Sequence, residues 1–218
     1  KSKGTLYNAV EIEEFQKILG ESQIDYRKKY MIPEGSRVIS FTGRLIPEKG
    51  IRQLVYAVKA INLSRIENKQ LPVYLVIAGD GPLYQEIQKI SDSYTIMTGQ
   101  IDFEHIVKLL DASDIFCLPS DSEGFPTSVL EAVACKCFVI TTYQGGAREL
   151  LINEEYGIIM KDNTTELIQE NLEKVLENDT YRLRAEEKSY ERLVQYFTWN
   201  ATAKKVMQIA EKMNGEKE

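Results

Sequence analysis

The chain has little of the chemistry that metal sites and covalent catalysis most often use. It contains one histidine and three cysteines in 218 residues. The single histidine, His105, argues against a histidine-ligated metal and against histidine-based catalysis within these residues. Cys117, Cys135 and Cys137 are odd in number, and the last two form a C-x-C pattern. They therefore indicate reduced thiols of a cytosolic protein, in preference to a disulfide framework or a zinc site.

An excess of positive charge and a long apolar run are also absent. The formal net charge is −6, so no global basic field attracts nucleic acid or an anionic membrane. No stretch is long and apolar enough to cross a membrane, and the sequence has no signal peptide. The chain opens on Lys1 and not on methionine, so we expect it to be a piece of a longer protein.

The two best-known glycine-rich phosphate loops are missing. There is no G-x-G-x-x-G fingerprint, which argues against an NAD-dependent dehydrogenase. The P-loop pattern G-x-x-x-x-G-K-[ST] is not met either, because Gly43 and Gly50 have the wrong spacing and Ile51 follows them. A nucleotide site in this chain must therefore be built in another way.

What is present is an alternation of short apolar runs and amphipathic stretches, in an ordinary globular composition. The alternation predicts an α/β fold, a Rossmann-like doubly wound parallel sheet. The predicted strands are 38–42, 73–78, 94–97, 115–118, 138–141 and 157–160. We divide the chain into a hinge or linker with a leading helix (1–35), the sheet domain (36–195) and a C-terminal helix (196–218).

The stretch Ser120–Glu131 organises the rest of the chain. It follows the predicted strand at 115–118 and leads through a Gly-Phe-Pro turn into an apolar helix. Pro126, Thr127 and Ser128 stand at the predicted helix start, where proline fits the first turn and hydroxyls cap it. A strand, a short loop and a helix N-terminus together form an anion site, because free N–H groups and the helix dipole favour negative charge.

Two carboxylates flank this predicted anion site. Glu123 precedes the helix, and Glu131 lies about one turn inside it, about 6 Å along the axis. With a diphosphate at the helix start, one acid can reach the sugar of a nucleotide-sugar and the other its ribose. The alternative for Glu131 is that it caps the helix or pairs with a lysine, and the alternative for Glu123 is that it is a solvated loop residue. For either acid taken alone, we favour the alternative. For both at this spacing, we favour a site.

A second loop, Gly43–Gly50, carries two cations after the first predicted strand. Arg44 can offer a bidentate fork to phosphate and Lys49 a point charge, and the alternative is that both are solvated. In open α/β sheets, anions bind at the carboxyl ends of the strands. Asp80 lies between two glycines after the second strand. We therefore favour a turn residue over a ligand contact as its interpretation.

These motifs together resemble glycosyltransferase family 4, whose members are retaining, nucleotide-sugar-dependent enzymes of the GT-B type. The similarity covers nearly the whole chain, and the E-x-seven-E spacing around Gly-Phe-Pro is its most specific signal. The resemblance implies that the chain is the C-terminal, donor-binding half, without the N-terminal acceptor half. The matching segments are Tyr7–Glu11, Gly43–Gly50, Ala78–Pro82, Ser120–Glu131, Gly145–Glu149 and Phe197–Trp199.

The resemblance also implies residue roles. Arg44 and Lys49 would contact the donor diphosphate, Glu123 the sugar hydroxyls and Glu131 the ribose. Asn8 would lie in the hinge between the two halves. The sugar and phosphate path would be lined by backbone groups of Gly124, Phe125, Thr127 and Ser128. The base would be flanked by Gln100 and Ile101.

The chain departs from the family pattern in places that carry none of these contacts. Ala9 and Glu11 replace the hinge glycine and aspartate. Lys136-Cys137-Phe138 stands where the family often has Gly-x-Pro, so that turn is expected to differ.

The implied activity is transfer of a hexose from a nucleoside-diphosphate sugar, taken as a UDP-hexose, to a glycan or lipid-linked acceptor in polysaccharide synthesis. No metal and no cofactor is expected, and this half is expected to be inactive alone. A non-catalytic nucleotide-sugar-binding or regulatory domain and a GT-B sugar-nucleotide epimerase remain as alternatives. The expected location is cytoplasmic, with association at the inner membrane face through the absent half left open.

Overall fold

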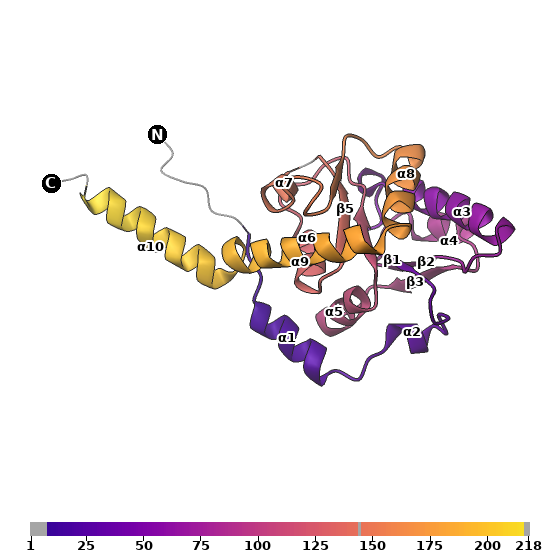
Figure 1. Cartoon of the computed structure of the whole chain (residues 1–218), viewed down its shortest axis with the longest axis horizontal. Coiled ribbons are helices and arrows are strands. Elements are labelled where there is room, and N and C mark those ends of the chain that lie inside the picture. The colour runs from indigo at the N-terminus through magenta and orange to yellow at the C-terminus, as the bar shows by residue number, and fades with distance from the viewer. Residues whose placement is uncertain (1–7, 144, 216–218) are drawn as a thin grey trace.

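The sheet has six parallel strands in the order β3-β2-β1-β4-β5-β6. The computed structural model describes residues 8–143 and 145–215 of the chain (Figure 1). The predicted doubly wound α/β sheet is confirmed by this strand order. The strands are β1 (Val38–Thr42), β2 (Tyr74–Ala78), β3 (Thr95–Gly99), β4 (Ile115–Leu118), β5 (Phe138–Thr142) and β6 (Ile158–Met160).

The central strands are buried along their whole length. Every residue of β1, β4 and β5 is buried, because helices cover both faces of the sheet. β1 pairs with β2 from Val38 opposite Tyr74 to Thr42 opposite Ala78, so the two strands end level with each other. This register brings the loops that follow β1 and β2 together at the carboxyl edge of the sheet.

Two helical layers enclose the sheet. One layer contains α3, α4 and α8, and the other contains α1, α5, α6 and α9 (Figure 1). Residues 22–25, between α1 and α2, are not helical. The helices are α1 (Ile12–Glu21), α2 (Tyr26–Lys29), α3 (Ile51–Glu67), α4 (Tyr84–Ile90), α5 (Phe103–Asp111), α6 (Thr127–Ala134), α7 (Ala147–Leu150), α8 (Thr165–Leu176), α9 (Asp179–Tyr196), α10 (Trp199–Gly215) and a 3₁₀ turn η1 (Pro47–Lys49).

The last helix lies apart from the two layers. α10 extends away from the sheet, beyond the end of α9 (Figure 1). Among the described residues, none of the helices is of a length and apolarity that would span a bilayer. The division of the chain at residues 35 and 195 stays a prediction.

The strand order reverses between β1 and β4. From β1 the chain proceeds outward to β2 and β3, and from β4 it proceeds outward to β5 and β6. The connections from β1 and β4 therefore leave to opposite sides of the sheet. In open α/β sheets this switch point is where ligands bind.

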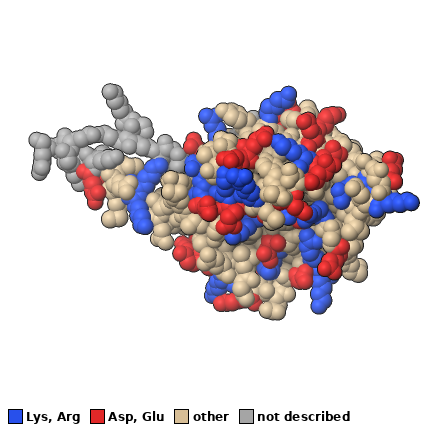
Figure 2. Space-filling model, viewed as in Figure 1, with Lys and Arg blue, Asp and Glu red and all other residues tan. Residues whose placement is uncertain are grey.

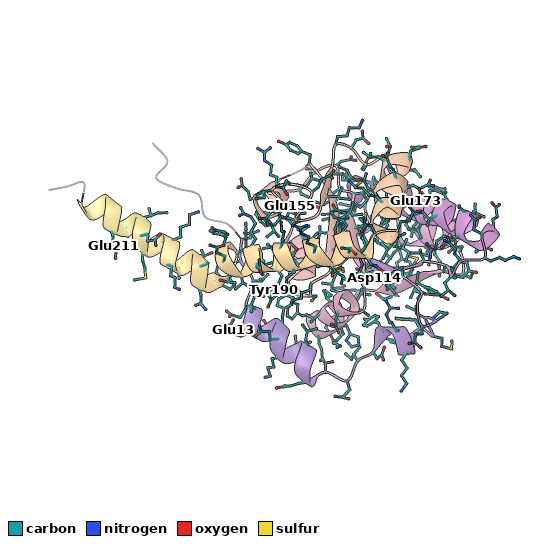
Figure 3. The ribbon with its side chains drawn as sticks, viewed as in Figure 1. Glu13, Asp114, Glu155, Glu173, Tyr190 and Glu211 are labelled. Carbon is teal, nitrogen blue, oxygen red and sulfur yellow. The ribbon has the colours of Figure 1, made fainter. Side chains whose placement is uncertain are left out.

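A network of charged side chains lies at the opposite edge of the sheet, where the strands begin. Asp114, labelled beneath α9 in Figure 3, accepts from the backbone N–H of Val38 at 2.8 Å. It also accepts from Arg37 at 2.8 Å and from Arg27 at 3.1 Å. The Asp114 side chain is only 9% exposed, so loss of its carboxylate would leave the buried Val38 N–H without an acceptor and remove one of the acceptors of each arginine.

We predict that Asp114→Ala destabilises the fold by about 3 to 5 kcal/mol, as expected when one partner of a buried ion pair is removed. The measurement is urea unfolding followed by circular dichroism. Asp111→Ala is the matched control, because the Asp111 carboxylate that pairs with Lys108 is 45% exposed, and an ion pair of an exposed carboxylate contributes at most about 1 kcal/mol. Equal losses for the two variants would contradict the importance of the Asp114 network.

Candidate functional site

A cavity of about 450 Å³ opens at the carboxyl ends of β1, β2 and β3. It contains three of the residues singled out in the sequence, Arg44, Gln100 and Ile101. The remaining wall comes from the strand ends and the following loops: Thr42, Gly43, Ala78, Gly79, Asp80 and Ile106. The cavity thus lies beside the switch point, where a ligand site was predicted.

Backbone hydrogen bonds hold the β1 loop against the β2 loop. The N–H of Gly43 donates to Ala78 O at 3.0 Å, and the N–H of Leu45 donates to Asp80 O at 2.9 Å. Arg44 stands between these two anchored residues. The Asp80 carboxylate accepts from its neighbour Gly81 N at 2.7 Å, as a turn aspartate does, although Asp80 also lines the cavity.

Arg44 is the exposed cation of this cavity. No hydrogen bond or ion pair engages its guanidinium within residues 8–143 and 145–215. An exposed guanidinium beside a polar cavity is ready to form two charge-assisted hydrogen bonds with a phosphate or carboxylate.

The β4 loop is held against the β1 loop by two bonds to one carbonyl. Glu48 O accepts from the N–H of Asp121 at 2.7 Å and from Ser120 Oγ at 3.1 Å. Gly50, at φ +66°, lies so close to the β4 loop that a Cβ atom would stand 2.0 Å from Pro119 O. The two loops at the switch point therefore touch through their backbones, and a side chain at position 50 would separate them.

This contact brings Lys49 and Glu123 together as an ion pair. The Lys49 ammonium approaches Glu123 Oε1, and the two side chains are 21% and 12% exposed. The sequence placed one on a phosphate and the other on a sugar, and the structure places them in contact across the switch point. Both remain partly accessible, so a ligand can still reach either group.

The first turn of α6 leaves its N–H groups open. The structure puts Pro126 at the N-cap and begins the helix at Thr127. The expectation that hydroxyls cap this helix is wrong, because proline occupies the capping position and has no hydroxyl. The first intrahelical contact is from Val129 N to Pro126 O at 3.2 Å, and within the described residues the N–H groups of Thr127 and Ser128 have no acceptor.

Glu131 is a half-buried carboxylate on α6. Burial raises the pKa of Glu131, and no other cause contributes. The alternatives of a cap or a lysine pair are not observed, since its carboxylate has no hydrogen bond or ion pair to any residue that the structure describes. A half-buried acid without a partner is costly, so an external hydrogen-bond donor would stabilise its charged form.

The structure does not bring all of the predicted residues into one cavity. Arg44, Gln100 and Ile101 line it, whereas the Lys49–Glu123 pair lies at the loop junction. The residues on α6 and the turn before it are outside the lining of that cavity; these are Gly124, Phe125, Thr127, Ser128 and Glu131. A ligand that used all of them would have to extend from the cavity across the switch point to α6.

The paired glycines after β5 close the other side of the turn before α6. A Cβ atom on Gly145, at φ +59°, would lie 1.7 Å from Gly124 O. A side chain at position 145 would therefore push the two backbones apart. Two residues that had not been singled out from the sequence hold the β4 loop. The Thr142 hydroxyl donates to Ser120 O, and the Asn163 amide donates to Pro119 O at 3.0 Å. Neither has a sequence signal that would mark it.

No three His, Cys, Asp or Glu side chains gather as a metal site requires in the part of the chain that the structure describes. Asp121 and Glu123 have the spacing of a D-x-D motif, but Glu123 pairs with Lys49. The Cys117, Cys135 and Cys137 thiols are free and buried, and burial raises the pKa of each. These groups offer neither a metal site nor a reactive thiolate.

Comparison with curated proteins gives relatives of moderate similarity. An uncharacterized glycosyltransferase of Methanocaldococcus jannaschii is 27% identical over 213 residues, covering 95% of this chain and 52% of that protein. A Bacillus subtilis protein named as a teichuronic acid biosynthesis glycosyltransferase, TuaC, is 30% identical over 184 residues, covering 84% of this chain and 44% of that protein. The chain thus spans about half the length of the curated relatives it matches.

Solved structures share the fold. HepE of Anabaena in complex with UDP aligns with a TM-score of 0.76 at 19% identity, over 97% of this chain and 57% of that one. Sucrose-phosphate synthase from Thermosynechococcus elongatus aligns with a TM-score of 0.78 at 20% identity, over 97% of this chain and 52% of that one. Residues 22–192, which include the whole sheet and most of its helices, match the family described as "Glycosyl transferases group 1". The chain therefore belongs to the group 1 glycosyl transferases.

Proposed function

We propose that this chain is the donor-binding domain of a retaining glycosyltransferase of family 4. The proposed reaction transfers a hexose from a UDP-sugar to a glycan or lipid-linked acceptor. The observation that carries the proposal is the free Arg44 guanidinium in a cavity beside the Lys49–Glu123 pair, at the switch point of the sheet. The HepE structures, one with UDP and one with UDP-glucose, support a nucleotide-sugar ligand.

The donor would lie across the switch point. Its base would enter the cavity beside Gln100 and Ile101, and the half-buried Glu131 carboxylate would accept hydrogen bonds from the ribose. Its diphosphate would lie near Arg44 and the open N–H groups at the start of α6. Ribose hydroxyls would supply the donors that Glu131 lacks among the described residues, which is the physical reason for this orientation.

In the absence of donor, Lys49 and Glu123 would neutralise each other, and the donor would replace this ion pair when it binds. A diphosphate would take over the Lys49 ammonium, and the sugar hydroxyls would take over the Glu123 carboxylate. Because each partner exchanges one charged or polar contact for another, neither is left buried without a partner. Glu123 would then orient the sugar and would not serve as a base for water.

The leaving group would be UDP, whose negative charge grows as the glycosidic bond breaks. Arg44, Lys49 and the α6 N-terminus are preorganised positive charge at that position, and such charge stabilises the developing anion. We therefore propose that the donor binds without a metal ion. In this scheme the proton of the acceptor hydroxyl goes to the leaving phosphate.

The acceptor would be bound outside this domain. The curated relatives are about twice as long as the matched segment, and we propose that their additional half corresponds to an acceptor domain. This chain alone would then bind donor without transferring the sugar. The name of the TuaC relative, which refers to teichuronic acid, supports a glycan acceptor and a role in polysaccharide synthesis.

The first test removes Arg44, the cation that we expect to bind the diphosphate. Arg44→Ala should weaken UDP binding about tenfold or more, because hydrogen bonds to charged groups are among the strongest in water. The measurement is isothermal titration calorimetry of UDP in a buffer that contains EDTA. Arg184→Ala is the matched control, since Arg184 is exposed on α9, away from the cavity.

Two results would contradict the proposal. Equal UDP affinity of Arg44→Ala and wild type would remove the diphosphate from this cavity. Binding that appeared only after Mg²⁺ or Mn²⁺ replaced EDTA would contradict the proposal that the donor binds without a metal ion. It would not contradict the proposed location of the site.

The second test concerns the ribose and its pH dependence. Glu131→Gln should weaken UDP several-fold and leave the affinity for 2′,3′-dideoxy-UDP nearly unchanged, because the dideoxy ligand has no hydroxyls to bind. Burial raises the pKa of Glu131 in the free protein, whereas ribose donors would lower it in the complex. UDP affinity should therefore fall as the pH drops through the raised pKa, and this component should vanish in Glu131→Gln.

Titration of the UDP phosphate itself, with a pKa of about 6, affects wild type and variant alike. The difference between their pH profiles thus isolates Glu131. Equal losses of UDP and dideoxy-UDP affinity in Glu131→Gln would exclude the ribose contact and point to a structural effect.

A further inference from the structure

We infer that Asn8 is a positioning residue for the donor loop, which we define as residues 123–126. The inference rests on the proposed function, because the loop has a donor to receive only if the domain binds one. Asn8 lies in the linker, 117 positions from the loop residue that it contacts. Its amide Nδ2 donates to the backbone carbonyl of Phe125 at 3.1 Å.

A second distant group holds the neighbouring carbonyl. The N–H of Gly146 donates to Gly124 O at 2.8 Å, from the loop between β5 and α7. Two consecutive carbonyls of the donor loop are thus bound by donors from outside it. Because the peptide unit is planar, fixing a carbonyl fixes the plane of the peptide that follows it, and so the course of the backbone into Pro126 and α6.

Aromatic packing ties the same loop to the end of α9. The rings of Phe125 and Phe197 have centroids 5.7 Å apart. Phe197 O in turn accepts from the N–H of Val10 at 3.0 Å, and Val10 forms a parallel bridge with Thr198. The linker therefore contacts the donor loop directly through Asn8 and indirectly through Phe197.

The donor loop lies between two fixed segments of backbone, and its Glu123 side chain pairs with Lys49. Asp121, before the loop, is anchored to Glu48 O, and Val129 belongs to the first turn of α6. Between these anchors Gly124 is exposed and Phe125 is half-buried. We therefore expect the Asn8 amide to set where the α6 N-terminus and the Glu123 carboxylate face the donor, so that a shift of the linker would change donor affinity.

The test removes the amide donor without changing its shape. Asn8→Asp replaces the N–H group with an oxygen that cannot donate to Phe125 O, and Asn8→Ala removes the group entirely. Asn200→Asp is the matched control, because it makes the same chemical change at an exposed position on α10. All are made in the whole 218-residue chain, and thermal unfolding verifies that each variant folds.

The first readout needs no ligand. Hydrogen exchange of the Gly146 N–H, followed by NMR, should be at least about threefold faster in both Asn8 variants, since its acceptor Gly124 O becomes mobile. Exchange of the Asp121 N–H, which is bound to Glu48 O, should not change. The second readout is the Kd for UDP, which should rise about three- to tenfold in the Asn8 variants and stay constant in Asn200→Asp.

Unchanged Gly146 exchange in both Asn8 variants would overturn the inference, whatever their affinity for UDP. Faster exchange with unchanged UDP affinity would also overturn it, because the loop would then move without consequence for the donor. A wild-type chain that does not bind UDP would overturn the proposed function instead, and this is seen in the wild-type titration before any variant is made.

Discussion

The contact between the β1 and β4 loops is the constraint on which the rest of the site depends. β1 and β4 are neighbours in the sheet, and their connections leave to opposite sides. The Glu48 carbonyl binds both Ser120 and Asp121, and Gly50 lets the two backbones meet at Pro119. Without this contact nothing would bring the Lys49 and Glu123 side chains together, and the first turn of α6 would not be fixed beside the cavity.

The charges at this junction differ in how well they are satisfied. Lys49 and Glu123 neutralise each other, and the charged network at the opposite edge of the sheet satisfies Asp114. Arg44, the first N–H groups of α6 and the Glu131 carboxylate have no partner among the described residues. Folding thus leaves cationic, dipolar and anionic groups open along one path, as a ligand with both a phosphate and hydroxyl groups would require. Figure 2 shows that both signs of charge are interspersed on the face in view.

Much of the fold could be predicted from the sequence, because buried parallel strands appear as apolar runs separated by helical stretches. The six strand segments followed from the apolar runs alone. The contacts that close the site could not be predicted. The bonds from Thr142 and Asn163 to the β4 loop join segments far apart in the chain, and common polar residues give no local signal of such partners. The capping of α6 was mispredicted because Pro126, expected in the first turn, occupies the cap position itself.

The most direct test of the central claim is to map the bound nucleotide on the wild-type chain. Backbone amide shifts recorded by NMR during a titration with UDP-glucose would locate the ligand without any substitution. The account predicts the largest shifts at Thr127 and Ser128, at Gly43 to Gly50, and around Gln100. Shifts confined to the opposite edge of the sheet, around Arg27 and Arg37, with the α6 N-terminus unaffected, would contradict it.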